Sequence, residues 1–190
     1  PDACTQGACS SFPAIKTLVM LRHRLGAEGP KNVALSAEIC DGWIPMFLSP
    51  YRMNDQYADA MRIKSPDFEI AAAVPVVIDD DVEKARAQIK QNVGFYVGGM
   101  GAKTFNVHKD HVSRMGFGDA ADEIQNLFMS GKREQAFAAV PDALVDEIAL
   151  CGPKERIRER LQGWKDSPVT QLNVGSASVD TLRFFAEELL

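Results

Sequence analysis

Apolar and polar residues along this chain fall into short apolar runs separated by longer segments with helical periodicity. Three of the apolar runs have the length of a single β-strand: Trp43–Leu48, Phe68–Ile78 and Val169–Val174. The middle run contains few polar residues, which is typical of a strand covered on both faces. The predicted helices span 30–40, 54–62, 82–93, 120–129, 132–140, 141–150, 153–164 and 178–190. Strands that alternate with helices in this way predict an α/β fold with a parallel sheet.

The helix after Asp81 has the clearest pattern. Val82, Ala85, Ile89 and Val93 recur at helical spacing and therefore share one face. Asp81 directly precedes them, and its side chain can accept hydrogen bonds from the first backbone N–H groups. The sequence predicts a capped helix with one buried face.

Two prolines stand inside the predicted strands. Pro45 and Pro75 each lack the N–H that a central strand would donate to its neighbour. We expect each of them at a bulge or at a strand end.

Composition indicates an ordinary globular domain. The chain has 190 residues, of which 46% are hydrophobic, so it is long enough to bury a substantial core. The net charge of −5 and the pI of about 5.2 argue against a general nucleic-acid binder, which needs a basic surface. The longest apolar runs are too short to cross a bilayer, and no signal-peptide pattern is present. We expect a cytoplasmic protein with neither a nucleic-acid nor a membrane partner.

The histidines and aspartates do not form a metal-binding pattern. His108 and His111 lie close together, but no third ligand is near them in the sequence. Asp79–Asp81 lacks the alternate spacing of a calcium loop. We therefore expect no metal site.

No pair of cysteines has C-x-x-C spacing, so a zinc or redox motif is not indicated. We expect Cys40 and Cys151 to be small core residues, because apolar positions surround both. Cys4 and Cys9 lie in a polar segment, where they would be reactive thiols only if exposed.

A candidate anion site begins at Gly29-Pro30. Glycine followed by proline is a common entry into a helix, because proline lacks an N–H that the first turn does not need. The N–H groups of that first turn and the positive end of the helix dipole favour a phosphate or another anion. Simple capping of the helix is the alternative interpretation.

The segment from Gly26 to Pro30, the helix after it and Asp41-Gly42-Trp43 resemble the region after the fifth strand in the luciferase-like flavin and deazaflavin oxidoreductases. The resemblance is closest to the branch that uses the deazaflavin coenzyme F420. It implies the C-terminal part of a (β/α)8 TIM barrel, with FMN as the alternative cofactor. It also implies that the coenzyme phosphate lies against the turn, with contributions from Gly26, Ala27, Gly29, Pro30 and Lys31.

Two further segments bear on the site. Tyr96–Gly101 with Phe105-Asn106 resembles an insertion that walls the coenzyme pocket in this branch. The glycines of this segment would let backbone approach a ligand or would form a flexible helix end.

Arg52 follows a predicted strand, where active sites of β/α barrels lie. We expect it to bind an anionic group of the substrate or coenzyme, with a solvated surface arginine as the alternative.

The resemblance covers residues 26–190, and we expect 1–25 to be an irregular leader outside it. The segment Met20–Leu25 would place three cationic groups in a barrel strand, where burial without partners is prohibitive. A complete barrel takes roughly 250 residues. The acid and base groups of this family come from the half that precedes Gly26, so no catalytic residue is assigned.

The resemblance implies an oxidoreductase that performs hydride transfer or oxygenation on a small molecule, present here as a truncated chain. A non-catalytic half barrel that pairs with its own copy is an alternative, because open sheet edges favour association. An inactive remnant is the third possibility. We expect either a homo-oligomer or a partner that supplies the missing strands.

Overall fold

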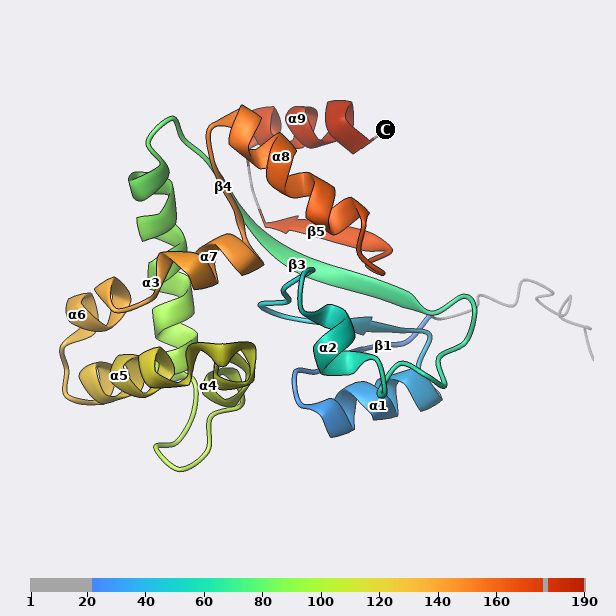
Figure 1. Ribbon diagram of the computed structural model, residues 1–190, viewed down its shortest axis with the longest axis horizontal. Coiled ribbons are helices and arrows are strands. Elements are labelled where there is room, and N and C mark those ends of the chain that lie inside the picture. The colour runs from blue at the N-terminus through green and yellow to red at the C-terminus, as the bar shows by residue number, and fades with distance from the viewer. Residues whose placement is uncertain (1–21, 176–177, 190) are drawn as a thin grey trace, which may run out of the picture.

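The computed structural model describes residues 22–175 and 178–189, and it contains an α/β arrangement with one parallel sheet (Figure 1). The strands are β1 (Arg24–Gly26), β2 (Gly42–Ile44), β3 (Glu69–Ile78), β4 (Leu150–Gly152) and β5 (Gln171–Gly175). The helices are α1 (Pro30–Ile39), α2 (Met53–Tyr57), α3 (Val82–Gly99), α4 (Val107–Val112), the π-helical segment η1 (Ser113–Phe117), α5 (Gly118–Met129), α6 (Arg133–Ala138), α7 (Asp142–Ile148), α8 (Lys154–Lys165) and α9 (Val179–Leu189).

The long strand β3 organises the sheet. It pairs in parallel with β2 near its start, with β5 along its middle and with β4 at its end. β1 pairs in parallel with β2, so the strand order is β1-β2-β3-β4, and β5 joins the sheet by pairing with β3. In the described part of the chain, β1 and β5 each pair with a single strand. The expected association with another copy or partner stays a prediction.

The two prolines of the predicted strands take different positions in the sheet. Pro45 directly follows the end of β2. Pro75 lies between the bridge of Ala73 to Met46 and the start of pairing with β4 at Val76. The predicted strand-end position is therefore confirmed for Pro45. The prediction is wrong for Pro75, which lies inside β3 in register with Gly175 of β5.

The cationic residues at the start of β1 are exposed, so the unpaired burial that the sequence analysis called prohibitive does not occur. Arg22 Nη1 lies 2.5 Å from Glu69 Oε1, and Arg24 pairs with the other oxygen of the same carboxylate. Arg22, His23 and Arg24 are all exposed. Because β1 begins at the rim of the sheet, these side chains remain in solvent and the strand forms without burying charge.

The core has two parts. The even-numbered residues of β3, from Ile70 to Val76, pack with α1, α2, α8 and α9 in one cluster. The second cluster joins α3, α5, α6 and α7, which lie to one side of the strands in Figure 1. The predicted inward positions Ile157, Leu161 and Trp164 are all buried in the first cluster, which confirms them.

The glycines of α3 pack against aromatic rings, a role that neither interpretation from sequence, ligand approach or a flexible helix end, included. A Cβ on Gly98 would lie 2.6 Å from Cβ of Phe128, and one on Gly94 would lie 2.7 Å from Phe137 Cδ1. Helix α3 extends to Gly99. The glycines allow α5 and α6 to approach α3 closely, which is a packing role.

Some boundaries differ from the sequence predictions. The predicted helix over 141–150 ends at Ile148, and its last residues begin β4, a short strand that the apolar pattern did not separate from the helix. Helix α2 ends at Tyr57, short of Arg62. Cys151 is buried as predicted, whereas Cys40 is only half-buried. Cys4 and Cys9 lie outside the described residues.

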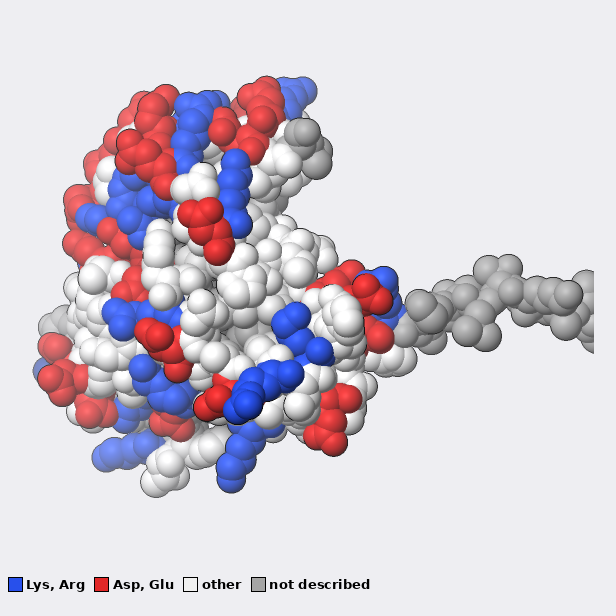
Figure 2. Space-filling model, turned by 45° about the vertical axis from the view of Figure 1, so that its right-hand side comes forward, with Lys and Arg blue, Asp and Glu red and all other residues white. Residues whose placement is uncertain are grey.

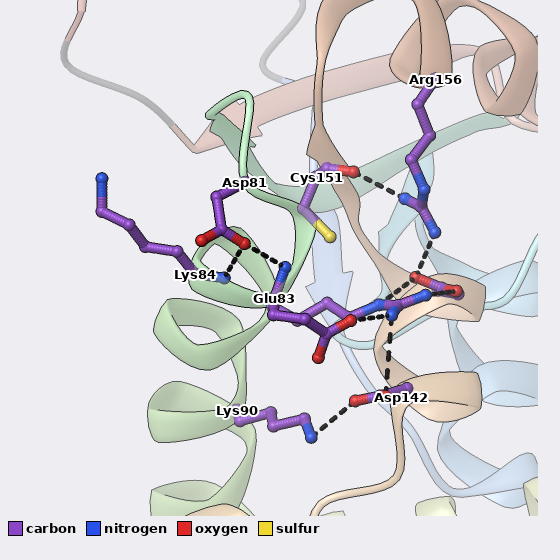
Figure 3. A network of polar contacts seen from close by, with 9 residues as sticks. Asp81, Glu83, Lys84, Lys90, Asp142, Cys151 and Arg156 are labelled. Carbon is purple, nitrogen blue, oxygen red and sulfur yellow. Dashed lines mark hydrogen bonds and ion pairs between the residues drawn. The ribbon is translucent and has the colours of Figure 1, made fainter.

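An ion-pair network fastens α3 to α7 and α8 (Figure 3). Asp146 accepts hydrogen bonds from Arg86 Nη2 at 2.6 Å and from Arg156 Nη2 at 2.8 Å. Burial alone would raise the pKa of Asp146, but these hydrogen bonds outweigh it and lower the pKa below its usual range. Asp81 accepts from the backbone of Glu83 and Lys84, which confirms the predicted cap. The network belongs to the scaffold.

Candidate functional site

A pocket of about 860 Å³ opens at the carboxyl ends of β1 and β2. Ile44 and Ala73 line the pocket from the face of the sheet that points away from the core. They lie on this face because successive side chains along a strand point to opposite faces. The turn after β1, the start of α1 and the α4 region form the remaining walls. The lining residues are Gly26, Ala27, Glu28, Gly29, Pro30, Lys31, Asn32, Ile44, Pro45, Met46, Ala73, Phe105, Val107, His108, Asp110 and Arg114.

All the residues predicted to bind the coenzyme lie together in this pocket. Gly26 and Ala27 continue from the end of β1, and Gly29, Pro30 and Lys31 form the start of α1. The carbonyl of Ala27 accepts a hydrogen bond of 2.7 Å from Trp43 Nε1, which fixes the turn against the buried core. The sequence pattern therefore located this wall of the pocket, whereas the predicted coenzyme contact itself stays a prediction.

The start of α1 has the features of an anion site. Gly29 is its N-cap residue, with extended backbone angles and no side-chain cap. A Cβ on Gly29 would meet no atom within 4 Å, so the space in front of the helix is open. Lys31 is exposed at the same rim. An uncapped helix start beside a lysine suits a phosphate group, whose oxygens need N–H donors and positive charge. The residues present thus fit the phosphate of a flavin-type coenzyme.

Arg52 does not line this pocket. Its Nε and Nη2 atoms lie 2.6 and 2.7 Å from the two carboxylate oxygens of Glu147, and its guanidinium lies 5.9 Å from the centre of the Phe117 ring. This hydrogen bonding raises the pKa of Arg52 above the usual arginine value. The structure therefore gives Arg52 a bidentate partner that links α2 to α7, and its predicted substrate contact stays a prediction.

Residues between Phe105 and Arg114 form a further wall of the pocket. Of the segment that the resemblance implied, Phe105 lines the pocket, whereas Tyr96–Gly101 is not among the lining residues. Asn106 anchors this wall, because its side chain caps α4 and donates to the carbonyls of Tyr96 and Val97. Phe105, immediately before the anchor, is 71% exposed and faces the pocket. Gly116, at a φ of 92°, accommodates the left-handed backbone inside η1.

Glu28 is the central polar residue that sequence reasoning missed. It is 7% exposed, and its Oε1 lies 2.7 Å from His108 Nδ1. Its backbone carbonyl accepts hydrogen bonds from the hydroxyl of Tyr57 at 3.0 Å and from Arg114 Nη2 at 2.9 Å. A glutamate between Ala27 and Gly29 was the available signal, but nothing local in the sequence indicates its distant partners.

His111 is buried next to Tyr57, one of the residues that contact Glu28. Its Nδ1 is 3.1 Å from the Tyr57 hydroxyl and its Nε2 is 3.1 Å from the carbonyl of Phe47. Burial disfavours the charged ring and lowers the pKa of His111 below its usual value, although the hydrogen bond to Phe47 opposes this shift. Burial likewise raises the pKa of Tyr57. At neutral pH both groups are therefore uncharged.

Other kinds of site are not indicated in the part of the chain that the structure describes. Residues 22–175 and 178–189 contain no cluster of histidine, cysteine and acidic side chains that could hold a metal ion. Within the same ranges, no helix combines the length and apolarity that a bilayer crossing requires. On the face drawn in Figure 2, basic and acidic residues are interspersed around a white, uncharged central area.

The sequence profile of the luciferase-like monooxygenase family matches residues 22–171. A putative coenzyme F420-dependent oxidoreductase of Mycobacterium tuberculosis is 43% identical over 171 residues, which cover 85% of this chain and 49% of that protein. The 5,10-methylenetetrahydromethanopterin reductase of Archaeoglobus fulgidus is 27% identical over 158 residues, which cover 80% of this chain and 47% of the reductase.

Solved structures agree on the fold. The coenzyme F420-dependent tetrahydromethanopterin reductase of Methanopyrus kandleri superimposes with a TM-score of 0.65 at 18% identity, over 88% of this chain and 50% of that one. An F420-dependent secondary alcohol dehydrogenase gives a TM-score of 0.61 at 16% identity, over 87% of this chain and 47% of that one. The chain thus spans about half the length of the relatives it matches, and its parallel strands form part of a luciferase-like TIM barrel. By its sequence match and its fold, this chain belongs to the luciferase-like monooxygenase family.

Proposed function

We propose that this chain forms the phosphate-binding side of a coenzyme F420 site in an oxidoreductase. The observation that carries the proposal is the uncapped start of α1, which opens with Gly29 and Lys31 into a pocket large enough for a coenzyme. The relative that is 43% identical is a putative coenzyme F420-dependent oxidoreductase, and this similarity favours F420 over FMN.

The residues of this chain would bind and orient the coenzyme. Backbone N–H groups at the start of α1 and the Lys31 ammonium would hold the phosphate, while Ile44, Met46 and Ala73 would exclude water from the apolar part of the ligand. When bound, F420 would supply hydride transfer. Monooxygenation, which the family name includes, would require a flavin in the same pocket. No acid or base of the reaction is assigned to the described residues.

A thermal melt of the purified chain with and without F420 tests the proposal. A ligand that binds only the folded state raises the free energy of unfolding by RT ln(1 + [L]/Kd), or about 2.7 kcal/mol at a hundredfold excess over Kd. We expect F420 to raise the midpoint and FMN to raise it less. A cooperative melt that neither ligand shifts would mean that the fold lacks a working coenzyme site, and a larger shift with FMN would reassign the cofactor.

A further inference from the structure

Two side chains from different elements hold a single backbone carbonyl at the entrance of α1. The hydroxyl of Tyr57, the last residue of α2, donates to the Glu28 carbonyl at 3.0 Å. Nη2 of Arg114, from η1, donates to the same oxygen at 2.9 Å. A backbone carbonyl has two lone pairs, so these two donors saturate it.

The direction of this carbonyl determines the direction of the next N–H. The Glu28 carbonyl and the Gly29 N–H belong to one planar trans peptide unit, in which they point in opposite directions. Held by Tyr57 and Arg114, the peptide cannot rotate freely, so the Gly29 N–H is fixed facing away from them. Gly29 is the N-cap residue of α1, lines the pocket, and has no side chain that could occupy the helix start.

The carboxylate of Glu28 adds a third attachment. Its Oε1 lies 2.7 Å from His108 Nδ1 on α4, so the turn is fixed to the opposite wall of the pocket as well. Its other oxygen, Oε2, has no hydrogen-bond partner among the described residues. The turn is therefore held through both its backbone and its side chain, by residues between 29 and 86 positions away.

We propose that Tyr57 and Arg114 are positioning residues that preorganise the Gly29 peptide, and with it the start of α1, for the coenzyme phosphate. This inference rests on the proposed phosphate site. A donor that is already aimed at the phosphate loses less orientational freedom on binding, which raises affinity for a phosphate-bearing ligand. Tyr57 is 2% exposed and does not line the pocket, so it acts through Glu28 and not by touching the coenzyme.

The test compares two ligands on the same variants. One ligand is F420, and the other is its ribityl deazaflavin analogue, which lacks the phosphate and everything beyond it. The measured quantity is the preference ratio, defined as the dissociation constant of the analogue divided by that of F420. Tyr57→Phe removes only the hydroxyl and changes no charge. The same hydroxyl also lies 3.1 Å from His111 Nδ1, and losing that buried contact should affect both ligands alike, so the preference ratio reports the contact to Glu28. Tyr51→Phe is the matched control, because Tyr51 is 53% exposed and lies outside the pocket.

We expect Tyr57→Phe to lower the preference ratio by about five- to tenfold, the effect of one hydrogen bond, with the affinity for the analogue unchanged. Tyr51→Phe should leave the ratio at the wild-type value. A Tyr57→Phe chain that binds both ligands with equal losses, or with no loss, would overturn the inference, because a general structural role moves both affinities together.

A variant at Arg114 gives a second, independent test of the inference. It also replaces the first test if Tyr57→Phe does not fold. Arg114 is exposed and also lines the pocket, so the variant is Arg114→Lys, which should fold normally and keep a positive charge near the ligand while losing the guanidinium that donates to the Glu28 carbonyl. We expect it to lower the preference ratio, and an unchanged ratio in this variant would overturn its part in the inference. If the wild-type chain itself binds both ligands equally or binds neither, the proposed phosphate site is at fault and the positioning inference falls with it.

Discussion

The carboxylate of Glu28 lies 2.7 Å from Nδ1 of His108, although 80 positions separate the two residues. Their side chains are 7% and 14% exposed, so this contact joins the turn after β1 to α4 out of bulk water. The pair therefore closes one end of the pocket by connecting its two walls.

Breaking this pair should destabilise the fold. His108→Leu leaves the Glu28 carboxylate buried without its partner, and we expect a loss of about 1.5–3 kcal/mol in the free energy of unfolding. Removing both side chains in a Glu28→Leu, His108→Leu double variant should cost less than the sum of the two single changes. Chemical denaturation measures all three.

The exposed pair of Asp59 and Arg62 provides the control, because its side chains are 99% and 77% exposed. Asp59→Asn should change stability little, since solvent screens such pairs. Strictly additive losses at Glu28 and His108 would show that the two side chains do not stabilise each other.

Glycines inside helices should tolerate substitution according to what each one contacts, as Gly98 of α3 and Gly163 of α8 illustrate. A Cβ on Gly98 would lie 2.6 Å from Cβ of Phe128, which cannot move without shifting α5. We expect Gly98→Ala to lower the free energy of unfolding by about 1–3 kcal/mol through overpacking. In Gly163→Ala the new methyl would meet only the ring of Tyr51, an exposed side chain that can swing aside. That variant should be neutral or slightly stabilising, because alanine favours a helix over glycine. Equal effects from the two substitutions in a thermal melt would refute the packing role of Gly98.

The buried ring of His111 should make stability depend on pH. Its pKa is lowered in the folded chain, chiefly by burial, whereas an unfolded histidine binds a proton near the usual value of about 6.5. As pH falls through that value, the unfolded state takes up more protons than the folded state, so stability is present above it and decreases below it. We expect the wild-type melting temperature to fall between about pH 7.5 and pH 5.5. His111→Gln should show a shallower decline over the same range, and parallel curves for the two proteins would contradict this assignment.

Substitution of Arg52 tests whether this residue has a structural role or a ligand-binding role. Its bidentate contact with Glu147, at 2.6 and 2.7 Å, links α2 to α7 away from the pocket. We expect Arg52→Gln to lower the melting temperature while leaving the dissociation constant for F420 unchanged. An unchanged melt combined with weaker ligand binding would instead support the substrate contact that the sequence suggested.

The elements predicted correctly are those whose signals are local. β3 is a continuous apolar run, and the start of α3 follows from Asp81 and its periodic face. The Gly29-Pro30 helix entry is equally local, which is why the wall of the pocket was located from sequence. Each of these rests on neighbouring residues that act within one element.

The errors concern contacts between distant segments. From sequence, the glycines of α3 could let backbone approach a ligand or could form a flexible helix end, and only the approach of Phe128 shows their packing role. β4 is three residues long and continues an apolar helix pattern, so its pairing with β3 has no local signal. Glu28 has the same property, because its partners Tyr57, His108 and Arg114 come from separate elements.

The most direct test of the phosphate site is a titration of F420 into wild type and Gly29→Asp. The open space at Gly29 accommodates the new side chain, and aspartate is a favourable N-cap residue, so the unliganded fold should be as stable as wild type or slightly more stable. The carboxylate would occupy the N–H groups at the start of α1 and repel the phosphate. We predict a loss of at least tenfold in F420 affinity with no loss of melting temperature. Equal affinity of the two proteins for F420 would contradict the placement of the coenzyme phosphate at this helix start.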